Sequence, residues 1–314
     1  MKRVVFYSAG PDIGGCGIAL KRAFDKYAPD WEARAICRQK VYLDYETDLF
    51  WPLGYHTHQR REVIRLLRDA DVLHVMDNER GLQASAPYLR GKTLVLHHLG
   101  SHFRNHERAV SQVARRYGAI EVTDSVDLIR PHVGFMPVPA DFTALAKLRK
   151  EQYRPSHRVR IAHAPTHRPI KSTQHIIQAV EELSKRYPID FDLIERVGNR
   201  ECLERKARAD IFVDQLLLGF GVNVIESWAM GIPVVSGWGD PEHEGRSLEL
   251  FGQLPWASAT PQTLVSVLEH LVTSPEWRAE LGARGHRHGM EWHSEPAVVR
   301  RTIDLYESAQ EQAA

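Results

Sequence analysis

The sequence predicts an α/β protein built from two successive units, each a parallel sheet with helices on both faces. Two observations predict this fold class. Short apolar runs alternate with amphipathic helical stretches along the chain, which is the pattern of parallel strands joined by crossover helices. The length of 314 residues also exceeds a comfortable single core, because domains usually contain about 100–200 residues.

The first half opens with a strand, a glycine-rich turn and a helix. The apolar run 3–7 precedes the turn 10–17, and Ile18, Leu20 and Phe24 then recur at helical spacing. The same alternation predicts four further strands and one helix, namely strands at 33–37, 72–76, 93–97 and 119–123 and a helix at 59–70. We expect this first domain to span residues 1–145.

The alternation lapses over 137–157, where a proline-containing stretch is followed by a polar, basic one, and this predicts a linker over 146–157. The pattern then restarts in a second domain, expected over 158–294. Its predicted elements are strands at 158–163, 190–194, 210–213 and 232–235 and a helix at 173–187. The last segment, 295–314, has helical spacing and could pack on either half, the first domain included.

Composition narrows the class of protein. Hydrophobic residues make up 43% of the chain and charged residues 26%, as in ordinary globular proteins. No apolar run approaches the about 20 residues that span a bilayer. The chain starts with a strand-like segment rather than a signal peptide, so a cytoplasmic protein is expected, with peripheral membrane association left open. Cys16, Cys37 and Cys202 have no C-x-x-C spacing and are expected as reduced thiols.

Charge is distributed unevenly between the two halves. Residues 1–157 contain 24 Lys and Arg against 18 Asp and Glu, whereas the rest contains 17 against 22. A basic first half favours an anionic partner, such as a nucleic acid, an acidic membrane surface or a phosphorylated acceptor. An ordinary solvated surface is the alternative.

The most specific motif lies at 210–235. A strand leads into the turn Gly219–Phe220–Gly221, a helix follows from about Val222, and Gly231 ends it. Glycines let the backbone approach a ligand closely, and a helix N-terminus attracts phosphate. Glu226 follows about one turn into the helix, where its carboxylate can accept hydrogen bonds from the vicinal hydroxyls of a ribose.

Residues 219–235, GFGVNVIESWAMGIPVV, resemble the Glu-x7-Glu signature of retaining, family-4-like glycosyltransferases of the GT-B superfamily. The resemblance implies two Rossmann-like domains facing each other across a cleft, and transfer from a nucleotide-diphosphate sugar, expected to be a UDP-sugar, without a metal or other cofactor. It implies that Gly219, Phe220, Gly221, Val222, Asn223 and Glu226 bind the donor. The first Glu of the signature falls on Leu218, which leaves Asp214 or Gln215 as substitutes for the sugar-binding carboxylate.

The segment 163–173, HAPTHRPIKST, is similar to the phosphate-binding loop of the same family. Lys171 and Arg168 would neutralise the leaving diphosphate, and this stabilisation of charge lowers the barrier to breaking the glycosidic bond. The family arginine falls on Thr166, which is expected to contact the donor, so Arg168 is a shifted candidate. A solvated basic loop is the alternative.

The glycine cluster Gly14, Gly15 and Gly17 stands where family members pack a loop against the donor phosphates. It does not fit a dinucleotide fingerprint, because Leu20 occupies the third glycine position and Arg38 follows the second strand in place of an acid. NAD binding is therefore not expected.

The segment 96–104, LHHLGSHFR, follows a predicted strand and is similar to the family segment that lines the interdomain cleft. His97 or His98 would contact the donor sugar or the acceptor, or transfer the acceptor proton; a structural histidine is the alternative. The acceptor side is expected to use five polar residues that follow strands, namely Asp77, Glu79, Arg80, Ser101 and Arg104.

Two readings other than glycosyl transfer remain open. A nucleotide-sugar epimerase or a phosphorylase uses the same two-domain frame, and a non-catalytic sugar-nucleotide or nucleic-acid binding protein would agree with Leu218 and the basic first half. His286, His288 and His293 fit no common zinc spacing, so no metal site is expected.

Overall fold

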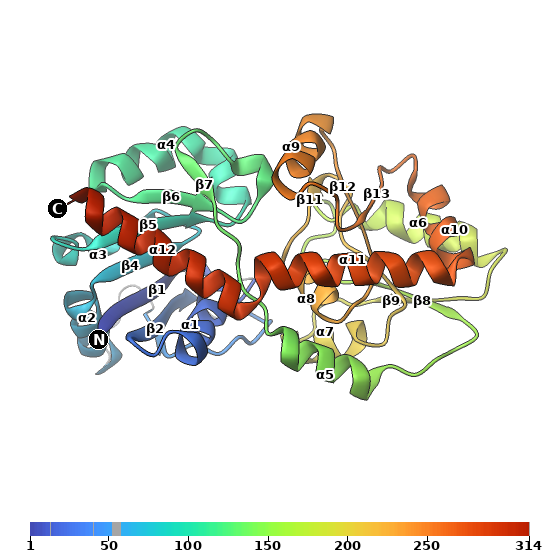
Figure 1. The fold of residues 1–314 in the computed structure, drawn as a ribbon, viewed down its shortest axis with the longest axis horizontal. Coiled ribbons are helices and arrows are strands. Elements are labelled where there is room, and N and C mark those ends of the chain that lie inside the picture. Colours follow the sequence, from blue (N-terminus) through green and yellow to red (C-terminus); the bar gives the residue numbers. More distant parts are fainter. Residues whose placement is uncertain (13, 40, 52–57, 314) are drawn as a thin grey trace. The chain divides into compact units, whose positions relative to one another are not determined.

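The computed structural model describes residues 1–12, 14–39, 41–51 and 58–313 (Figure 1). The chain forms two compact units. Unit 1 comprises Met1–Pro139 together with Glu295–Ala314, and unit 2 comprises Ala140–Ser294. Unit 1 is therefore assembled from two segments that are distant in the sequence, whereas unit 2 is continuous.

Unit 1 is built on a seven-stranded parallel sheet with the order β3-β2-β1-β4-β5-β6-β7. Its strands are β1 (Lys2–Pro11), β2 (Trp31–Gln39), β3 (Leu49–Phe50), β4 (Val72–Met76), β5 (Thr93–His98), β6 (Ile120–Thr123) and β7 (Val133–Phe135). Its helices are α1 (Cys16–Tyr27), α2 (His58–Asp69), α3 (Arg80–Ser85), α4 (Ser101–Tyr117) and α12 (Glu295–Ala313), with 3₁₀ turns η1 (Ala86–Tyr88) and η2 (Val126–Leu128). The strand order reverses between β1 and β4, and ligands bind beside such a reversal, at the carboxyl ends of the strands.

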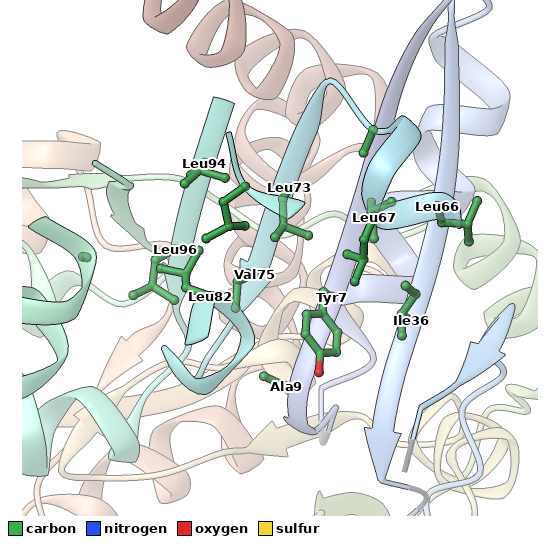
Figure 2. Packing of buried hydrophobic residues seen from close by; sticks show 14 of the residues in the cluster. Tyr7, Ala9, Ile36, Leu66, Leu67, Leu73, Val75, Leu82, Leu94 and Leu96 are labelled. Atoms are coloured by element: carbon green, nitrogen blue, oxygen red, sulfur yellow. The ribbon is translucent and has the colours of Figure 1, made fainter. Parts of the chain in front are cut away.

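The core of unit 1 lies between the sheet and its helices. Figure 2 shows Tyr7, Ile36, Leu73 and Leu96 from four adjacent strands packed with Leu67 of α2. Such burial stabilises the unit by roughly 1.5–3 kcal/mol for each large apolar side chain.

Helix α12 packs against α1 and β5, although it is separated from them by the whole of unit 2 in the sequence. Tyr306 of α12 is completely buried, and its ring packs against Phe24 and Trp31. Its hydroxyl lies 2.6 Å from Nδ1 of His74 on β4. The segment 295–314, for which the sequence left two options, thus belongs to unit 1.

Unit 2 is built on a second sheet, with the order β11-β12-β10-β8-β9 and β13 paired with β12. All its pairings are parallel except β11 with β12. Its strands are β8 (Val159–His163), β9 (Ile189–Leu193), β10 (Ile211–Val213), β11 (Leu218–Gly219), β12 (Val234–Trp238) and β13 (Ala257–Ser258). Its helices are α5 (Phe142–Gln152), α6 (Thr173–Ser184), α7 (Asn199–Lys206), α8 (Val222–Ala229), α9 (Pro241–Phe251), α10 (Leu264–Thr273) and α11 (Pro275–His293).

The predicted linker over 146–157 differs from the structure, because most of it continues helix α5. Asp141 begins this helix by accepting a hydrogen bond from the Ala144 N–H. The Arg149 guanidinium then donates to the carbonyls of Ala207 and Ala209, each at 2.6 Å, which attaches α5 to unit 2. The chain accordingly passes from unit 1 to unit 2 at Pro139–Ala140.

Candidate functional site

The strand order of unit 2 reverses between β8 and β10. The segments that contain the predicted donor-binding residues of unit 2 follow the carboxyl ends of these two strands. The loop 164–172 follows β8, residues 214–217 follow β10, and α8 begins shortly after. Nδ1 of His163 lies 2.8 Å from the carbonyl oxygen of Val213, which joins the two strand ends. Burial lowers the pKa of His163 to about 4, so its ring is neutral and structural.

Lys171 and Asp214 form an ion pair at this edge. The Lys171 ammonium donates to Oδ1 of Asp214 at 2.7 Å. The Lys171 side chain is 13% exposed and the Asp214 side chain 1%, so the cation is the partner that a ligand can reach. This places Lys171 where the sequence predicts a phosphate-binding lysine.

The N-terminus of α8 lies beside this ion pair. A Cβ added to Gly221 would lie 3.7 Å from the Lys171 ammonium nitrogen. The first hydrogen bond of this helix turn runs from the Val224 N–H to the Gly221 carbonyl, at 2.9 Å. The N–H groups of Val222 and Asn223 come before it, in the first turn, where N–H groups have no acceptor within the helix. The ammonium of Lys171 and the N-terminus of α8 together form a site suited to a phosphate.

Gly219 shapes the turn that leads into α8. Its φ of +67° lies in the left-handed region, and a Cβ there would lie 2.1 Å from the Trp238 ring. Phe220 is buried against Trp228 and Trp256. Phe220 therefore anchors the turn from within the core, although the sequence places it among the donor-binding residues.

Glu226 lies one turn into α8 and is held by a buried lysine. The ammonium of Lys206, which is completely buried, donates to Oε2 of Glu226 and, at 2.7 Å, to Oδ1 of Asn223. The Asn223 amide in turn donates to the carbonyl of Ala164 at 3.0 Å. The Glu226 side chain remains 11% exposed.

Other candidate residues for the donor site have partners or positions of their own. Thr166 and Arg168 are on the exposed part of the loop, and Arg168 forms an ion pair with Glu195, which lowers the pKa of that carboxyl. The amide of Gln215 donates to the carbonyl of Leu218 at 3.0 Å, so Gln215 supports the turn. Leu218 itself pairs with Trp238 in the short strand β11.

In unit 1, His97 and His98 are both completely buried, which differs from the expectation that one of them lines an open cleft. Nδ1 of His97 lies 3.2 Å from Nε2 of His74, and Nε2 of His98 lies 2.9 Å from Oε2 of Glu121. Burial lowers the pKa of His97 well below its ordinary value, and the neighbouring His74 and His98 lower it further. Both rings are held inside the protein, and proton transfer by either one stays a prediction.

The predicted acceptor residues gather at the carboxyl edge of the unit 1 sheet, and two of them, Glu79 and Arg104, have side-chain partners there. Glu79 lies 2.6 Å from the His102 ring. Arg104 binds both carboxylate oxygens of Asp127, at 2.5 and 2.8 Å. Burial raises the pKa of Asp77. Arg80 and Ser101 are exposed at the starts of α3 and α4.

The sequence analysis missed Asp124, which follows β6 directly at the same edge. Burial raises the pKa of its carboxyl to about 7; Arg104 opposes this shift, and the charges of Asp127 and Asp77 add to it. The position immediately after a predicted strand, at 119–123, is the signal that would have found it.

The glycine cluster of unit 1 serves a different local purpose from the expected one. The Asp12 carboxylate accepts hydrogen bonds from the N–H groups of Cys16 (2.8 Å) and Gly17 (3.1 Å) at the start of α1. A phosphate would have to compete with this carboxylate. Gly15 has a φ of +63°, and a Cβ there would lie 2.5 Å from the Tyr45 ring.

His288 and His293 lie in an aromatic cluster of unit 2 with Trp228. Burial lowers the pKa of His288 to about 3. In the described part of the chain, no three His, Cys, Asp or Glu side chains are grouped so that they could hold a metal ion. No described helix is long and apolar enough to cross a membrane.

Known protein families and curated proteins yield no match to the sequence. Solved structures do resemble the fold over nearly the whole chain. The Anabaena protein HepE in complex with UDP-glucose superposes with a TM-score of 0.65 at 14% identity, covering 98% of this chain and 100% of that one. An alpha-glucosyltransferase in complex with UDP and a 13-mer DNA superposes with a TM-score of 0.63 at 11% identity, covering 97% and 99%.

The chain has the GT-B fold. A protein described as a UDP-N-acetylglucosamine 2-epimerase, from Listeria monocytogenes, shares it, with a TM-score of 0.62 at 13% identity over 99% of this chain and 98% of that one. The neighbours are thus mostly glycosyltransferases, with an epimerase among them. At these identities the likeness establishes the fold, and the function has to be argued from the site.

Proposed function

We propose that this chain is a glycosyltransferase that moves a sugar from a UDP-sugar to an acceptor hydroxyl. The convergence of Lys171, the N-terminus of α8 and Glu226 at one strand reversal carries this proposal. Two complementary charges thereby face the same edge of the sheet, a cation for phosphate and an anion for hydroxyl groups. The UDP complexes among the structural neighbours support a uridine nucleotide.

In the proposed reaction, the acceptor oxygen bonds to the anomeric carbon as the bond from that carbon to the diphosphate oxygen breaks. The bonding electrons stay on the diphosphate, whose released oxygen takes up the proton of the acceptor hydroxyl. Lys171 and the N–H groups of Val222 and Asn223 stabilise the negative charge that develops on the leaving diphosphate. Thr166 and Arg168 lie on the exposed part of the same loop, and we assign them outer phosphate contacts, for which Arg168 would have to turn away from Glu195. Retention of configuration and transfer without a metal follow from the family resemblance and belong to the proposal.

Glu226 would bind the ribose of the donor. Each oxygen of a carboxylate can accept up to two hydrogen bonds, and Oε2 of Glu226 already accepts one from Lys206. Within the described residues Oε1 has no recorded hydrogen bond, so it is the oxygen that we assign to a ribose hydroxyl.

The donor assignment is tested by calorimetry with UDP on the wild type and on Glu226→Gln, using the exposed Glu280→Gln on α11 as the matched control. We expect Glu226→Gln to weaken UDP binding tenfold or more, because hydrogen bonds to charged groups contribute about 1.5–3 kcal/mol. Glu280→Gln should bind as the wild type does. If no nucleoside diphosphate binds the wild type, or if NAD binds instead, the proposal is wrong.

The acceptor is proposed to be anionic, for which a neighbour that holds DNA gives the support; unit 1 itself contains 22 Lys and Arg against 20 Asp and Glu, so its net charge alone favours no class of acceptor. The neighbour that holds DNA makes a nucleic acid one candidate, beside an acidic lipid surface and an anionic glycan. Binding of duplex DNA and of vesicles containing acidic lipid should be measured from 50 to 200 mM salt. An anionic acceptor predicts affinity for one of these, or for an anionic polysaccharide measured in the same way, that falls steeply with salt; affinity for none of the three contradicts this part of the proposal.

An epimerase is the second candidate function, favoured by the epimerase among the structural neighbours. Such an enzyme would convert UDP-N-acetylglucosamine with no acceptor present. Incubation of the protein with this nucleotide sugar alone, followed by separation of the epimers, distinguishes the two activities. A non-catalytic binding protein would instead bind UDP and catalyse neither reaction.

A further inference from the structure

Two ion pairs flank the N-terminus of α8, and they have opposite polarity. In the first, Lys171 is 13% exposed and Asp214 is 1% exposed. In the second, Glu226 is 11% exposed and Lys206 is completely buried. Each pair therefore presents one charge to the candidate site and keeps the opposite charge inside the protein.

Burial of the inner charge of each pair lowers the stability of the folded protein, so a role of the two pairs in ligand binding would explain the arrangement. A buried charge loses several kcal/mol of hydration, and well-packed apolar residues often stabilise a core as much as a buried ion pair does. A buried counterion can nevertheless fix the direction of a long, partly exposed side chain, which a functional group needs in order to act at a defined point.

Lys206 is well placed to fix Glu226. It ends helix α7, and its ammonium lies 5.0 Å from the centre of the Phe212 ring on β10. Its two side-chain acceptors, Asn223 and Glu226, are three residues apart on α8. The Asn223 amide extends the network to the carbonyl of Ala164, in the loop that carries Lys171.

Asp214 is equally well placed to fix Lys171. It follows β10 directly, and its N–H donates to the carbonyl of Val235 on β12 at 3.0 Å, so its backbone is part of the sheet. Oδ1 accepts from Lys171. Oδ2 is buried without a hydrogen-bond partner in the described structure and lies 4.0 Å from the point where a Cβ on Gly221 would be.

We infer that Asp214 and Lys206 are positioning residues of the donor site, one for each half of the nucleotide. Asp214 directs Lys171 to the diphosphate, and Lys206 directs Glu226 to the ribose. This inference rests on the proposed function and deepens it, because it names the buried groups that orient the phosphate-binding and the ribose-binding side chains. As positioning residues both would act without touching the ligand, which for Asp214 is an alternative to the sugar contact that the sequence predicts.

The test uses full-length protein and four ligands: UDP, UMP, 2′-deoxy-UDP and 3′-deoxy-UDP. Calorimetry gives two ratios of Kd, one for the missing phosphate (UMP over UDP) and one for a missing hydroxyl (the more affected deoxy compound over UDP). In the wild type both ratios should be about tenfold or more, as expected for charge-assisted hydrogen bonds.

Lys206→Gln should bring the hydroxyl ratio close to 1 and leave the phosphate ratio at the wild-type value. Asp214→Asn should do the reverse. A purely structural role predicts instead that each variant weakens all four ligands by the same factor, which leaves both ratios unchanged and overturns the inference.

Removal of one partner of a buried ion pair can prevent folding, so a second pair of variants keeps the test decisive. Lys206→Arg and Asp214→Glu retain the charge and move it. If the two residues position the ligand-binding side chains, Lys206→Arg should lower only the hydroxyl ratio and Asp214→Glu only the phosphate ratio. Wild-type ratios in both variants would overturn the inference. Failure of the wild type to bind UDP would contradict the proposed function itself, which distinguishes the two failures.

Discussion

At the scale of single residues, burial decides which polar groups at the strand ends can do chemistry. His97 and His98 stand directly at the end of a strand, as the sequence predicts, yet their rings are inside the protein. Asp124 stands at the end of the next strand, and its carboxyl has a pKa of about 7. A carboxyl that titrates near neutrality is suited to proton transfer, which makes Asp124 the titratable group of unit 1 to study first.

The raised pKa of Asp124 predicts a dependence of stability on pH. Between the ordinary pKa of 3.8 and about 7, the folded protein binds a proton that the unfolded chain releases, so this contribution to stability is lost as pH rises through that range. Asp124→Asn should remove it. We expect the variant to match the wild type only below about pH 4, to gain on it progressively between pH 4 and pH 7, and to keep that advantage at pH 8. Between pH 5 and pH 7 the two slopes should differ by at most about 1.4 kcal/mol per pH unit.

Urea unfolding at pH 5, 6, 7 and 8 measures this difference. The exposed Asp30→Asn, also in unit 1, is the control and should show the wild-type slope. Equal slopes for Asp124→Asn and the wild type would mean that the Asp124 carboxyl is ionised in the folded protein throughout the range.

The residues of the candidate site could be predicted from the sequence only in part. Lys171, Gly221 and Glu226 belong to local patterns in which a strand, a glycine turn and a helix follow one another. Lys206 lies in the polar stretch RECLERKARAD, where nothing local distinguishes a buried lysine from an exposed one. Its pairing with Glu226 depends on how α7 and α8 pack, which no local pattern reports.

At the scale of elements, alternation predicted most of the longer strands, because a buried parallel strand is visible as a short apolar run. It did not predict the two-residue strands β3, β11 and β13, which lack a pattern of their own and form through pairing with a neighbour. The sequence predicts a linker over 146–157, and so over the second half of helix α5, because that stretch is polar and basic, whereas the contacts of α5 through Arg149 are long-range.

The turn into α8 gives a prediction with a matched control inside the same unit. Gly219 and Gly231 have nearly the same φ, +67° and +68°, but a Cβ on Gly231 would meet nothing within 4 Å. Gly231→Ala should cost only the left-handed strain, about 1–2 kcal/mol. Gly219→Ala adds the clash with Trp238, a further 1–3 kcal/mol or so, and should also weaken UDP binding.

Thermal unfolding of the two variants gives the comparison. A Gly219→Ala variant that is no less stable than Gly231→Ala would show that the Trp238 ring moves aside freely. The Trp238 ring would then not be the reason for a glycine at position 219.

At the scale of the whole molecule, the sequence predicted two units but not how the chain is divided between them. The helical spacing of 295–310 was visible, but the partner of the helix was not, because packing of Tyr306 against Phe24 and Trp31 joins residues more than 270 positions apart. Unit 2, in contrast, begins and ends at neighbouring points, since the Ala140 N–H donates to the carbonyl of His293 at 2.9 Å.

This division predicts how fragments behave. The fragment 140–294 contains the whole of unit 2 and should fold by itself and bind UDP. The fragment 1–139 lacks α12 and should remain incompletely folded until a peptide of residues 295–314 is added. Circular dichroism and thermal unfolding of each fragment check both statements, and a cooperative transition of 1–139 alone would contradict the second.

The distance in sequence between Tyr306 and its ring partners also has a consequence for synthesis on the ribosome. Phe24, Trp31 and His74 are made before unit 2, and the side chain that covers them is made only after it. The continuous unit can thus finish folding while the one begun first still has apolar surface uncovered. During that interval the nascent chain presents this surface to chaperones and to other chains, and a ribosome that stalls before residue 306 leaves a product prone to aggregation.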